Sequence, residues 1–351
     1  MIKDCRVSIL RAPLRQAFVT ARGQHDRLEN LLFSLELSDG TKGFGEAAVA
    51  THITGETIPL TRKNLQAIAQ ELPGRRITDY LAVSAWLNEK FPANKSAVAA
   101  VETALLDAFT KQLKIPLWRF FGARPVPLTT DITIVISSLK ETQEAVQQYY
   151  RQGFRSFKVK IGRDQDLDLQ RVLAVKKIAR GSSLILDANQ GYTADQTLKF
   201  LRDLKRLGVR PVLIEQPVPR SDWDGLKRVS RLSEVPVCAD ESAGSLPDVV
   251  RVIREKAVPV INIKLMKFGM IQAREAACLA RGSGIGLMIG GMMESSLAMT
   301  AAAHLASGMG CFKYVDLDTP FFIKNGEKNP YLSSRGIYDL KKVKAGIGVE
   351  A

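Results

Sequence analysis

From about residue 130 to 317 the chain alternates short runs of apolar, β-branched residues with longer segments in which apolar positions recur every three or four residues. The short runs predict strands, and the longer segments, such as LKETQEAVQQYYRQG, predict amphipathic helices between them. Regular strand-then-helix alternation is typical of a parallel β/α barrel. Eight strands are predicted, at about residues 130–136, 156–162, 183–189, 211–217, 235–241, 260–266, 286–291 and 313–317.

The first part of the chain has a different pattern. Residues 1–47 contain three strand-like segments, CRVSIL, LENLLFSLEL and KGFGEA, with a hairpin turn at Asp39-Gly40. From about residue 57 to 113 the pattern is helical, most clearly in AVAAVETALLDAFTKQL. We therefore predict three parts: an α+β domain at residues 1–120, a barrel at 121–318, and a segment at 319–351 that packs back on the first domain.

Composition narrows the class of protein. The chain has 351 residues, of which 46% are hydrophobic, so it is long enough for a barrel and a smaller second core. The net charge of +14 comes from Lys and Arg scattered along predicted helices, so we expect a basic solvated surface and no nucleic-acid role. No apolar stretch can span a bilayer, and the first residues lack a signal-peptide core. The four cysteines show no CxxC pairing, which predicts reduced thiols in a cytoplasmic protein.

Five charged residues stand late in successive strand runs, at steps of 29, 28, 25 and 24 residues: Lys158, Asp187, Glu215, Asp240 and Lys264. A barrel keeps its chemistry at the carboxyl ends of its strands. The three acids belong to neighbouring strands, so their carboxylates can converge on one ion. All-oxygen ligands favour a hard cation, Mg²⁺, with Mn²⁺ as the alternative. The competing interpretation is three separate acids that cap strand ends or form salt bridges.

The lysines indicate the type of reaction. Lys160 and Lys264 lie on the second and sixth strands, which face each other across an eight-stranded barrel. Two amines on opposite sides of one carbon suit removal of a proton from one face and its return to the other, through an enediolate. Lys158 shares a face with Lys160, which favours a role as the cation on the substrate carboxylate. We expect the metal and the neighbouring ammonium group to lower the lysine pKa values; the alternative is lysines that only snorkel to the surface.

The motifs around these residues resemble the enolase superfamily, specifically its muconate-lactonizing-enzyme subgroup. They are KVK at 158–160, DANQGY at 187–192, IEQP at 214–217, ADES at 239–242 and NIKLMKFG at 262–269. GFGEA at 43–47 and the helical stretch after it resemble the capping domain of that superfamily. The resemblance implies an α/β fold, a modified TIM barrel of the (β/α)₇β type with an α+β capping domain. It also implies acid/base roles for the two facing lysines and metal ligation by the three acids.

A further motif, YVDLDTP, places Asp316 and Asp318 two residues apart at the end of the last strand, so their side chains face the same way. The pair resembles the DxD motif of dipeptide epimerases, in which two aspartates hold the free ammonium group of the dipeptide. Thr133 on the first strand matches a substrate-contacting threonine of that family. Gly291 in MIGGMMES lets the backbone approach the ligand. The alternative for the aspartates is a solvated strand end or a salt bridge to a lysine.

The predicted function is therefore a Mg²⁺-dependent dipeptide epimerase that inverts the α-carbon of the C-terminal residue. An N-acylamino-acid racemase, an o-succinylbenzoate synthase or a muconate-type cycloisomerase would use the same lysines and metal, but none of them needs an aspartate pair for a free amine. A non-enzymatic binding protein on a barrel scaffold is the other alternative. The sequence leaves the oligomeric state, monomer or homo-oligomer, open.

The substrate side chain is less well defined by the sequence. Arg22, in the loop TARGQHDR, is a candidate partner for an acidic side chain, with an ordinary surface arginine as the alternative. Ser296 stands where epimerases that act on Ala-Glu often supply a basic residue. His52 is a candidate to face the site from the first domain, although a lone histidine more often has a structural role.

Overall fold

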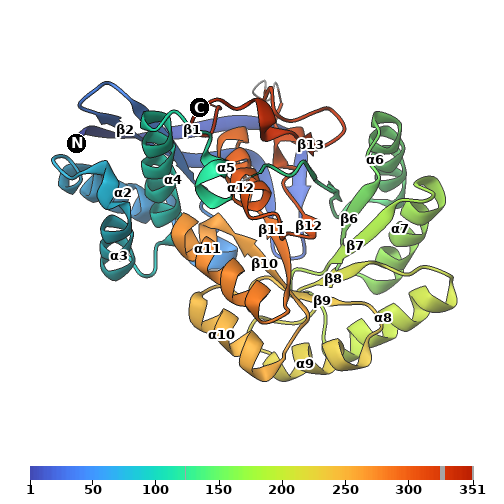
Figure 1. Ribbon diagram of the computed structural model, residues 1–351. Helices are drawn as coiled ribbons and strands as arrows, with labels where there is room; N and C mark the ends of the chain where they lie inside the picture. Colours follow the sequence, from blue (N-terminus) through green and yellow to red (C-terminus); the bar gives the residue numbers. More distant parts are fainter. Residues whose placement is uncertain (123, 325–328, 350–351) are drawn as a thin grey trace.

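The computed structural model describes all residues except 123, 325–328 and 350–351, and all side chains of the described residues except that of His52. The N-terminal part is an antiparallel sheet of order β1-β2-β3 with helices packed against it (Figure 1). Its strands are β1 (Ile2–Val19), β2 (Gln24–Leu37) and β3 (Lys42–Ala47), and its helices are α1 (Thr51–Thr54), α2 (Ile58–Glu71), α3 (Tyr80–Lys90), α4 (Lys95–Gln112) and α5 (Leu117–Phe121). The predicted meander and the helical stretch after it are confirmed.

The close contact between α4 and β3 depends on two glycines of the GFGEA segment. A Cβ atom at Gly43 would lie 2.1 Å from the Ala104 carbonyl oxygen, and one at Gly45 would lie 2.0 Å from that of Ala100. Any side chain there would therefore force the helix off the sheet. Small residues on both surfaces let α4 lie directly on the strand, and this helix is buried along most of its length.

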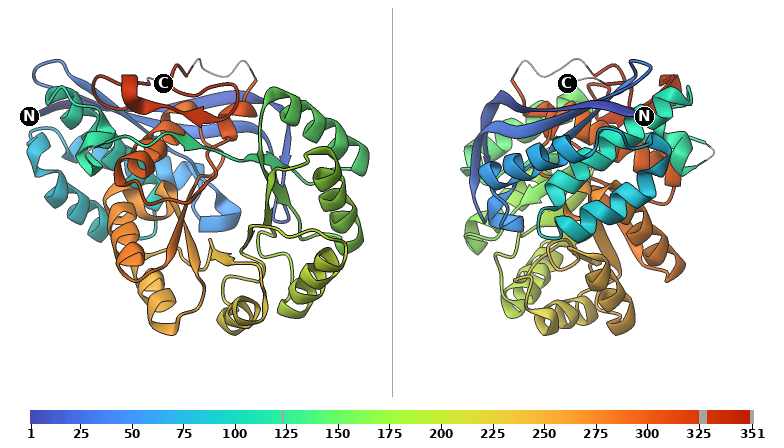
Figure 2. Two further views of the ribbon diagram at one scale, coloured as in Figure 1. Left: turned by 45° about the vertical axis from the view of Figure 1, so that its right-hand side comes forward. Right: turned by 90° about the vertical axis from the view of Figure 1, so that its left-hand side faces the viewer.

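The second part is a parallel sheet of eight strands in the order β12-β11-β10-β9-β8-β7-β6-β5, with helices outside it (Figure 2). Its strands are β5 (Ile132–Ile134), β6 (Ser156–Lys160), β7 (Ser183–Asp187), β8 (Leu213–Glu215), β9 (Val237–Ala239), β10 (Val260–Lys264), β11 (Gly286–Gly290) and β12 (Tyr314–Val315). Its helices are α6 (Leu139–Gln152), α7 (Gln165–Ile178), α8 (Ala194–Arg206), α9 (Trp223–Leu232), α10 (Leu246–Glu255), α11 (Leu265–Gly282) and α12 (Ser296–Met309). A 2.9 Å hydrogen bond from the Asp131 N–H to the Val315 carbonyl links the two ends of the sheet. The predicted modified TIM barrel with a capping domain is therefore confirmed.

All eight predicted barrel strands exist, but several end earlier than the apolar runs indicate. Asn189, Gln190 and Gln216 adopt positive φ angles of 42°, 70° and 33°, which an extended strand does not allow. The chain thus turns out of the sheet directly after Asp187 and Glu215. These turns place both acids at the very end of their strands, facing the mouth of the barrel.

The C-terminal segment contacts both domains. Leu14 of β1 forms an isolated bridge with Ile323, and the N–H of Ile347 donates a 2.8 Å hydrogen bond to Asp107 on α4. The short strand β13 (Ile337–Tyr338) pairs with β4 (Leu128–Thr129), which leads into the barrel. The segment thus joins the barrel to the capping domain, while the predicted domain boundaries stay a prediction.

Two further features concern the cysteines and the length of the helices. Cys5, Cys238, Cys278 and Cys311 are all free thiols, as the sequence predicts. In the part of the chain that the structure describes, none of the helices combines the length and the apolar character that crossing a membrane requires.

Candidate active site at the barrel mouth

The carboxyl ends of β6 to β10 carry the charged residues that the sequence singles out. Lys160 is paired in register with Asp187, and Asp187 with Glu215. Because residues in register on adjacent parallel strands point to the same face, these side chains project together into the barrel. Asp240 directly follows β9 and Lys264 ends β10. All five are buried, and the most exposed of them, Lys160, has only 7% of its surface exposed.

Lysine ammonium groups face the acids on the β6 side. Lys160 Nζ lies 2.6 Å from Asp187 Oδ2. Lys158 Nζ, which is deeply buried, lies 2.9 Å from Asp187 Oδ2 and 2.7 Å from Glu215 Oε2. It also donates a 2.6 Å hydrogen bond to Asp316 Oδ2. One ammonium group therefore links three acids that come from three different strand ends.

A second pair of lysines encloses Asp240 on the β10 side. Lys264 Nζ lies 2.7 Å from Asp240 Oδ2, and Lys267 Nζ lies 2.7 Å from Asp240 Oδ1. Lys267 Nζ also donates to the carbonyl groups of Asp240 and Asn262, at 2.6 and 2.8 Å, which fixes its position. Sequence reasoning misses Lys267. The signal for it is its place three residues after Lys264, close to one helical turn, in NIKLMKFG.

These charges shift the protonation of the groups in opposite directions. Burial raises the pKa of Glu215 to about 7, and the nearby Asp187 adds to the effect. Burial also acts to raise the pKa of Asp240, but Lys264 and Lys267 outweigh it and hold the pKa below its usual range. Burial acts to lower the pKa of Lys264, but Asp240 and Glu215 outweigh it and hold the pKa above its usual value. The protein groups alone thus raise the pKa of Lys264 because an acid faces it directly, and the lowering expected with a bound cation stays a prediction.

The three predicted metal ligands suit a divalent cation chemically. Glu215 Oε2 and Asp240 Oδ2 are buried, and neither accepts a hydrogen bond of good geometry within the described part of the chain, although a lysine lies 2.7 Å from each. Buried polar atoms normally have such a partner. Carboxylate oxygens left in this state at adjacent strand ends fit a hard, oxygen-binding cation. Asn262 Nδ2, 2.7 Å from Glu215 Oε1, holds one of these acids in orientation. Their role as ligands stays a prediction.

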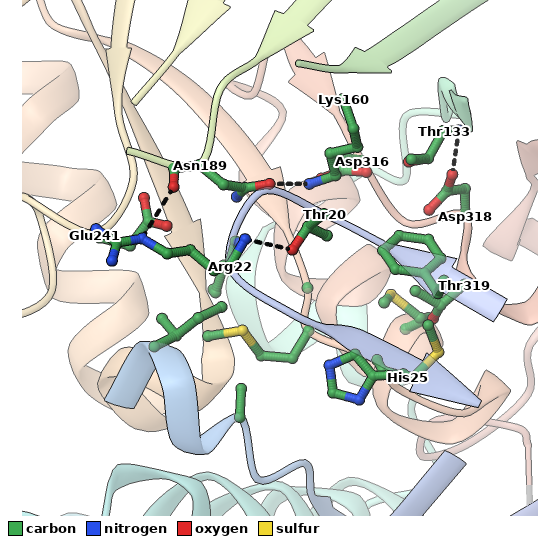
Figure 3. Close-up of a pocket in the computed structure, with 18 residues that line it drawn as sticks. Thr20, Arg22, His25, Thr133, Lys160, Asn189, Glu241, Asp316, Asp318 and Thr319 are labelled. Atoms are coloured by element: carbon green, nitrogen blue, oxygen red, sulfur yellow. Dashed lines mark hydrogen bonds between the residues drawn. The ribbon is translucent and has the colours of Figure 1, made fainter. Parts of the chain in front are cut away.

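A cavity lies at the barrel mouth, between the strand ends and the capping domain (Figure 3). Lys160 and Lys264 both line it, and their strands stand four places apart in the eight-stranded order, so they reach it from opposite sides. Among the described residues, Lys158 and the three acids are buried outside the lining of this cavity. The predicted site residues that do line it are Arg22, Thr133, Lys160, Lys264, Gly291, Asp316 and Asp318.

Asp316 and Asp318 reach the cavity from the end of β12. Asp318 Oδ2 accepts a 2.6 Å hydrogen bond from the Thr133 N–H group. Burial raises the pKa of Asp318 to about 7, and the adjacent Asp316 contributes. A third acid, Asp131, joins them: one oxygen of each lies within 4.8 Å of the other two. Sequence reasoning misses Asp131, although its place two residues before Thr133 puts both on the same face of the strand.

The remaining wall of the cavity has a substantial apolar part. Methionine side chains are flexible and adapt to irregular ligands. They make up half of the apolar part of this wall, which is formed by Phe18, Ala50, Ile53, Met292, Met293 and Met299; the polar residues beside it are Thr20, His25, Asn189, Glu241 and Thr319. The site therefore combines buried charges at the strand ends with an adaptable apolar surface beside them.

Comparisons with known proteins agree with this architecture. Residues 4–122 match the N-terminal domain of mandelate racemase and muconate lactonizing enzyme, and residues 141–351 match the enolase C-terminal domain-like family. The chain belongs to the mandelate racemase/muconate lactonizing enzyme family.

Several members of this family with assigned activities resemble the chain along nearly its whole length. A hydrophobic dipeptide epimerase from Citrifermentans bemidjiense is 49% identical over 361 residues, covering 99% of this chain and 97% of that protein. An L-Ala-D/L-Glu epimerase from Thermotoga maritima is 32% identical, covering 92% and 93%. The crystal structure of a dipeptide epimerase from Enterococcus faecalis, complexed with Mg and the dipeptide L-Leu-L-Tyr, has a TM-score of 0.95 at 28% identity, covering 100% and 99%.

The β1–β2 turn of this family member reaches across the site. Arg22 on that turn donates from Nε to the Asn189 carbonyl oxygen at 3.3 Å (Figure 3). It also donates from Nη2 to Gln190 Oε1 at 3.1 Å. Its guanidinium group is thus bonded to the barrel, and pairing with an acidic substrate stays a prediction. A Cβ atom at Gly291 would lie 2.3 Å from Met299 Cε, so this glycine preserves space in the cavity wall.

Other residues complete the account of the site. Glu241, which sequence reasoning misses, lines the cavity, and burial beside Asp240 raises its pKa to about 7. The signal for it is its position directly after a predicted ligand in ADES. Ser296 is buried at the start of α12. The predicted orientation of His52 concerns a side chain outside the described residues.

Proposed function

We propose that this chain is a Mg²⁺-dependent epimerase of hydrophobic dipeptides, which inverts the α-carbon of the C-terminal residue by two-base proton transfer. The observation that carries the proposal is the position of Lys160 and Lys264 on opposite sides of one cavity. A carbon held between them presents one face to each amine. Removal of the proton by one lysine and its return by the other inverts the carbon. The dipeptide epimerases among its relatives support this reaction.

The proposed ligands of the divalent cation are Asp187, Glu215 and Asp240, with Mg²⁺ as the metal and Mn²⁺ as a substitute. When bound, the cation supplies positive charge at the substrate carboxylate, where negative charge accumulates as the α-proton leaves. Lys158 is the proposed second source of positive charge there. Burial acts to lower the pKa of Lys158, but Asp187 and the other acids around it outweigh burial and hold the group protonated.

We assign recognition of the substrate's free amino group to Asp316 and Asp318. Both line the cavity, and the Thr133 N–H group orients the second of them. A free ammonium group placed against two buried carboxylates forms charge-assisted hydrogen bonds, which are stronger than neutral ones. This end of the cavity therefore favours a dipeptide over an amino acid whose nitrogen is acylated.

The apolar wall supports hydrophobic side chains on the substrate. Phe18, Ile53 and the three methionines of the lining offer no charged partner, and the guanidinium group of Arg22 is bonded to the barrel. Burial of an apolar side chain against such a wall is favourable in proportion to the area removed from water. The relative named as a hydrophobic dipeptide epimerase agrees with this preference.

A second candidate is an N-acylamino-acid racemase. The N-succinyl Arg/Lys racemase from Bacillus cereus has a TM-score of 0.94 with this chain at 27% identity, so the same fold serves that reaction as well. Two carboxylates at the amino end of the cavity would repel the free carboxylate of a succinyl group. Asp316 and Asp318 therefore favour the dipeptide.

The test compares L-Leu-L-Tyr with N-acetyl-L-Leu-L-Tyr as substrates. With Mg²⁺, we expect epimerisation of the free dipeptide at its C-terminal residue, and a kcat/KM at least about a hundredfold lower for the acetylated form, because the two acids lose their cationic partner. Activity should disappear after chelation and return with Mg²⁺. Equal rates for the two substrates, or full activity after exhaustive chelation, would contradict the proposal.

The free thiols also support the predicted cytoplasmic location, since reducing compartments keep cysteines unpaired.

A further inference from the structure

Asp131 has no part in the mechanism above, yet it lies deep inside the barrel. Its side chain is 1% exposed, and neither Oδ1 nor Oδ2 has a hydrogen-bond partner among the described residues. Its backbone N–H is held by the Val315 carbonyl, at the point where the two ends of the sheet meet. A buried carboxyl group without a partner costs stability, so its presence needs an explanation other than folding.

The surroundings of Asp131 supply that explanation. One oxygen each of Asp131, Asp316 and Asp318 lie within 4.8 Å of one another. Three points this close share a centre within about 2.8 Å of each, which is the usual length of a charge-assisted N–H···O bond. Lys158 Nζ donates a hydrogen bond to Asp316, and the Thr133 N–H donates one to Asp318, each at 2.6 Å. The oxygens of Asp131 therefore remain available to a donor from the substrate.

We propose that Asp131 is the third acid of the ammonium-binding subsite and strengthens its preference for substrates with a free amino group. The inference rests on the proposed function, because the ligand is the ammonium group of a dipeptide. That group carries three N–H donors, which match three carboxylate acceptors around one point. Asp316 and Asp318 line the open cavity, and Asp131 is buried beside them, with one of its oxygens within 4.8 Å of an oxygen of each.

The charges around Asp131 agree with this role. Burial raises the pKa of Asp131 well above its usual range; Asp316, Asp318 and the more distant Glu215 raise it further, and Lys158 opposes them. This direction favours the protonated form of Asp131 before substrate binds, and that form repels the neighbouring acids less. An ammonium group brings a positive charge to the same place and favours the ionised carboxylate.

The test uses two variants of the Mg²⁺-loaded protein, Asp131→Asn and Asp131→Ala. For L-Leu-L-Tyr we expect KM to rise at least about tenfold while kcat stays within about threefold, because the lysines and the metal ligands are untouched. The Tm of the substrate-free protein should stay equal or rise, because a partnerless buried acid is removed. The alanine variant separates loss of the acid from the new amide donor of asparagine, and it should show the same rise in KM.

Asp107→Asn is the matched control. This acid is also buried, but its oxygens accept hydrogen bonds from the Ile347 N–H, the Phe44 N–H and Lys111 Nζ. Its replacement should lower Tm and leave KM unchanged, which is the signature of a structural acid.

Three results would overturn the proposal. The first is an unchanged KM in both Asp131 variants, whatever happens to Tm. The second is the loss of a second bound Mn²⁺ per chain in Asp131→Asn with KM unchanged, because the cluster would then be a metal site. The third is a parent protein that does not epimerise dipeptides; this removes the proposed function as well, and it is seen without any variant. If the parent epimerises dipeptides and the Asp131 variants keep its KM, only the proposed role of Asp131 is rejected.

Discussion

Two regions of this molecule bury charged side chains and treat them differently. The catalytic rim consists of the strand-end residues Lys158, Lys160, Asp187, Glu215, Asp240 and Lys264. The domain seam consists of three acids of the capping domain that reach across to the rest of the chain, Glu46, Glu102 and Asp107. All nine are buried. The two regions differ in the hydrogen-bond and ion-pair partners of their buried charges.

In the domain seam each acid has at least one fixed backbone donor, although Asp107 also accepts from Lys111 Nζ at 2.8 Å. Glu102 Oε2 accepts a 2.9 Å hydrogen bond from the Ile271 N–H, and its other oxygen accepts one of 2.5 Å from Ser84 Oγ. Glu46 accepts a 3.0 Å hydrogen bond from the Ser295 N–H, and Asp107 accepts from the Ile347 N–H. Backbone donors of helices and loops cannot move away without unfolding. These acids therefore hold the capping domain on the barrel.

In the catalytic rim the partners are exchangeable. Glu215 Oε2 and Asp240 Oδ2 face only lysine ammonium groups, without good hydrogen-bond geometry among the described residues. A lysine is a flexible chain with a point charge at its end, so a metal ion or a substrate can displace it. A buried acid with fixed donors therefore serves stability, whereas one balanced by mobile cations serves binding and chemistry.

The largest expected effect is on the rim lysines. Lys160→Met and Lys264→Met keep the length of the side chain and remove the amine. Each should lower epimerisation at least about a thousandfold, because general acid–base catalysis contributes on this scale and neither lysine can replace the other across the cavity. Turnover of L-Leu-L-Tyr measures the catalytic role of these lysines, and Tm measures their contribution to stability. A variant that epimerises at the parent rate would show that the proton transfer uses another group.

The next effect concerns the metal. Glu215→Gln should weaken Mn²⁺ binding, measured by calorimetry, by about a hundredfold or more, because one anionic ligand of the proposed three becomes neutral. Activity should fall with it while the fold is retained. The seam variant Asp107→Asn should bind Mn²⁺ as the parent does. Equal metal affinity in Glu215→Gln would remove this residue from the ligand set.

A smaller effect is expected at the amino end of the cavity. Asp318→Asn should lower kcat/KM by roughly 10- to 150-fold without loss of bound metal, since a charge-assisted hydrogen bond contributes about 1.5–3 kcal/mol. Because burial and Asp316 raise the pKa of Asp318 to about 7, its ionised, ammonium-binding form increases as pH rises from 6 to 8. KM should therefore fall over that range in the parent and stay flatter in the variant. A KM that rises with pH in the parent would contradict this assignment.

The smallest effect on activity is expected in the seam. Glu102→Ala leaves the Ile271 N–H buried without an acceptor, which costs about 1–3 kcal/mol of stability. Thermal unfolding should show a clearly lower Tm, while kcat/KM for the dipeptide stays within about threefold of the parent. A large loss of activity with an unchanged Tm would break the distinction between the two regions.

Much of the fold and of the rim could be predicted from the sequence. Strand-then-helix alternation gave the eight barrel strands, and the position of Lys160, Asp187 and Glu215 late in their runs gave the side chains that meet at one edge. Strand ends were less accurate, because the positive φ angles of Asn189 and Gln216 depend on local turns that hydrophobic pattern does not report.

The interior contacts could not be predicted from the same pattern. The pairing of Lys267 with Asp240 depends on how α11 leaves β10, and the grouping of Asp131 with Asp316 depends on how the first and last strands meet. The raised pKa of Lys264 has a similar origin, since it depends on a 2.7 Å contact between neighbouring strands. Such effects are set by distances across the barrel, which the order of residues along one strand does not contain.

The central claim is that two lysines serve opposite faces of one α-carbon. The most direct test follows deuterium incorporation from D₂O into the C-terminal α-position of L-Leu-L-Tyr and L-Leu-D-Tyr, by NMR, with Lys160→Met and Lys264→Met. The account predicts that each variant exchanges the α-proton of one diastereomer only, and that the two variants choose opposite diastereomers. Exchange of the same diastereomer by both variants, or of both diastereomers by either one, would contradict it.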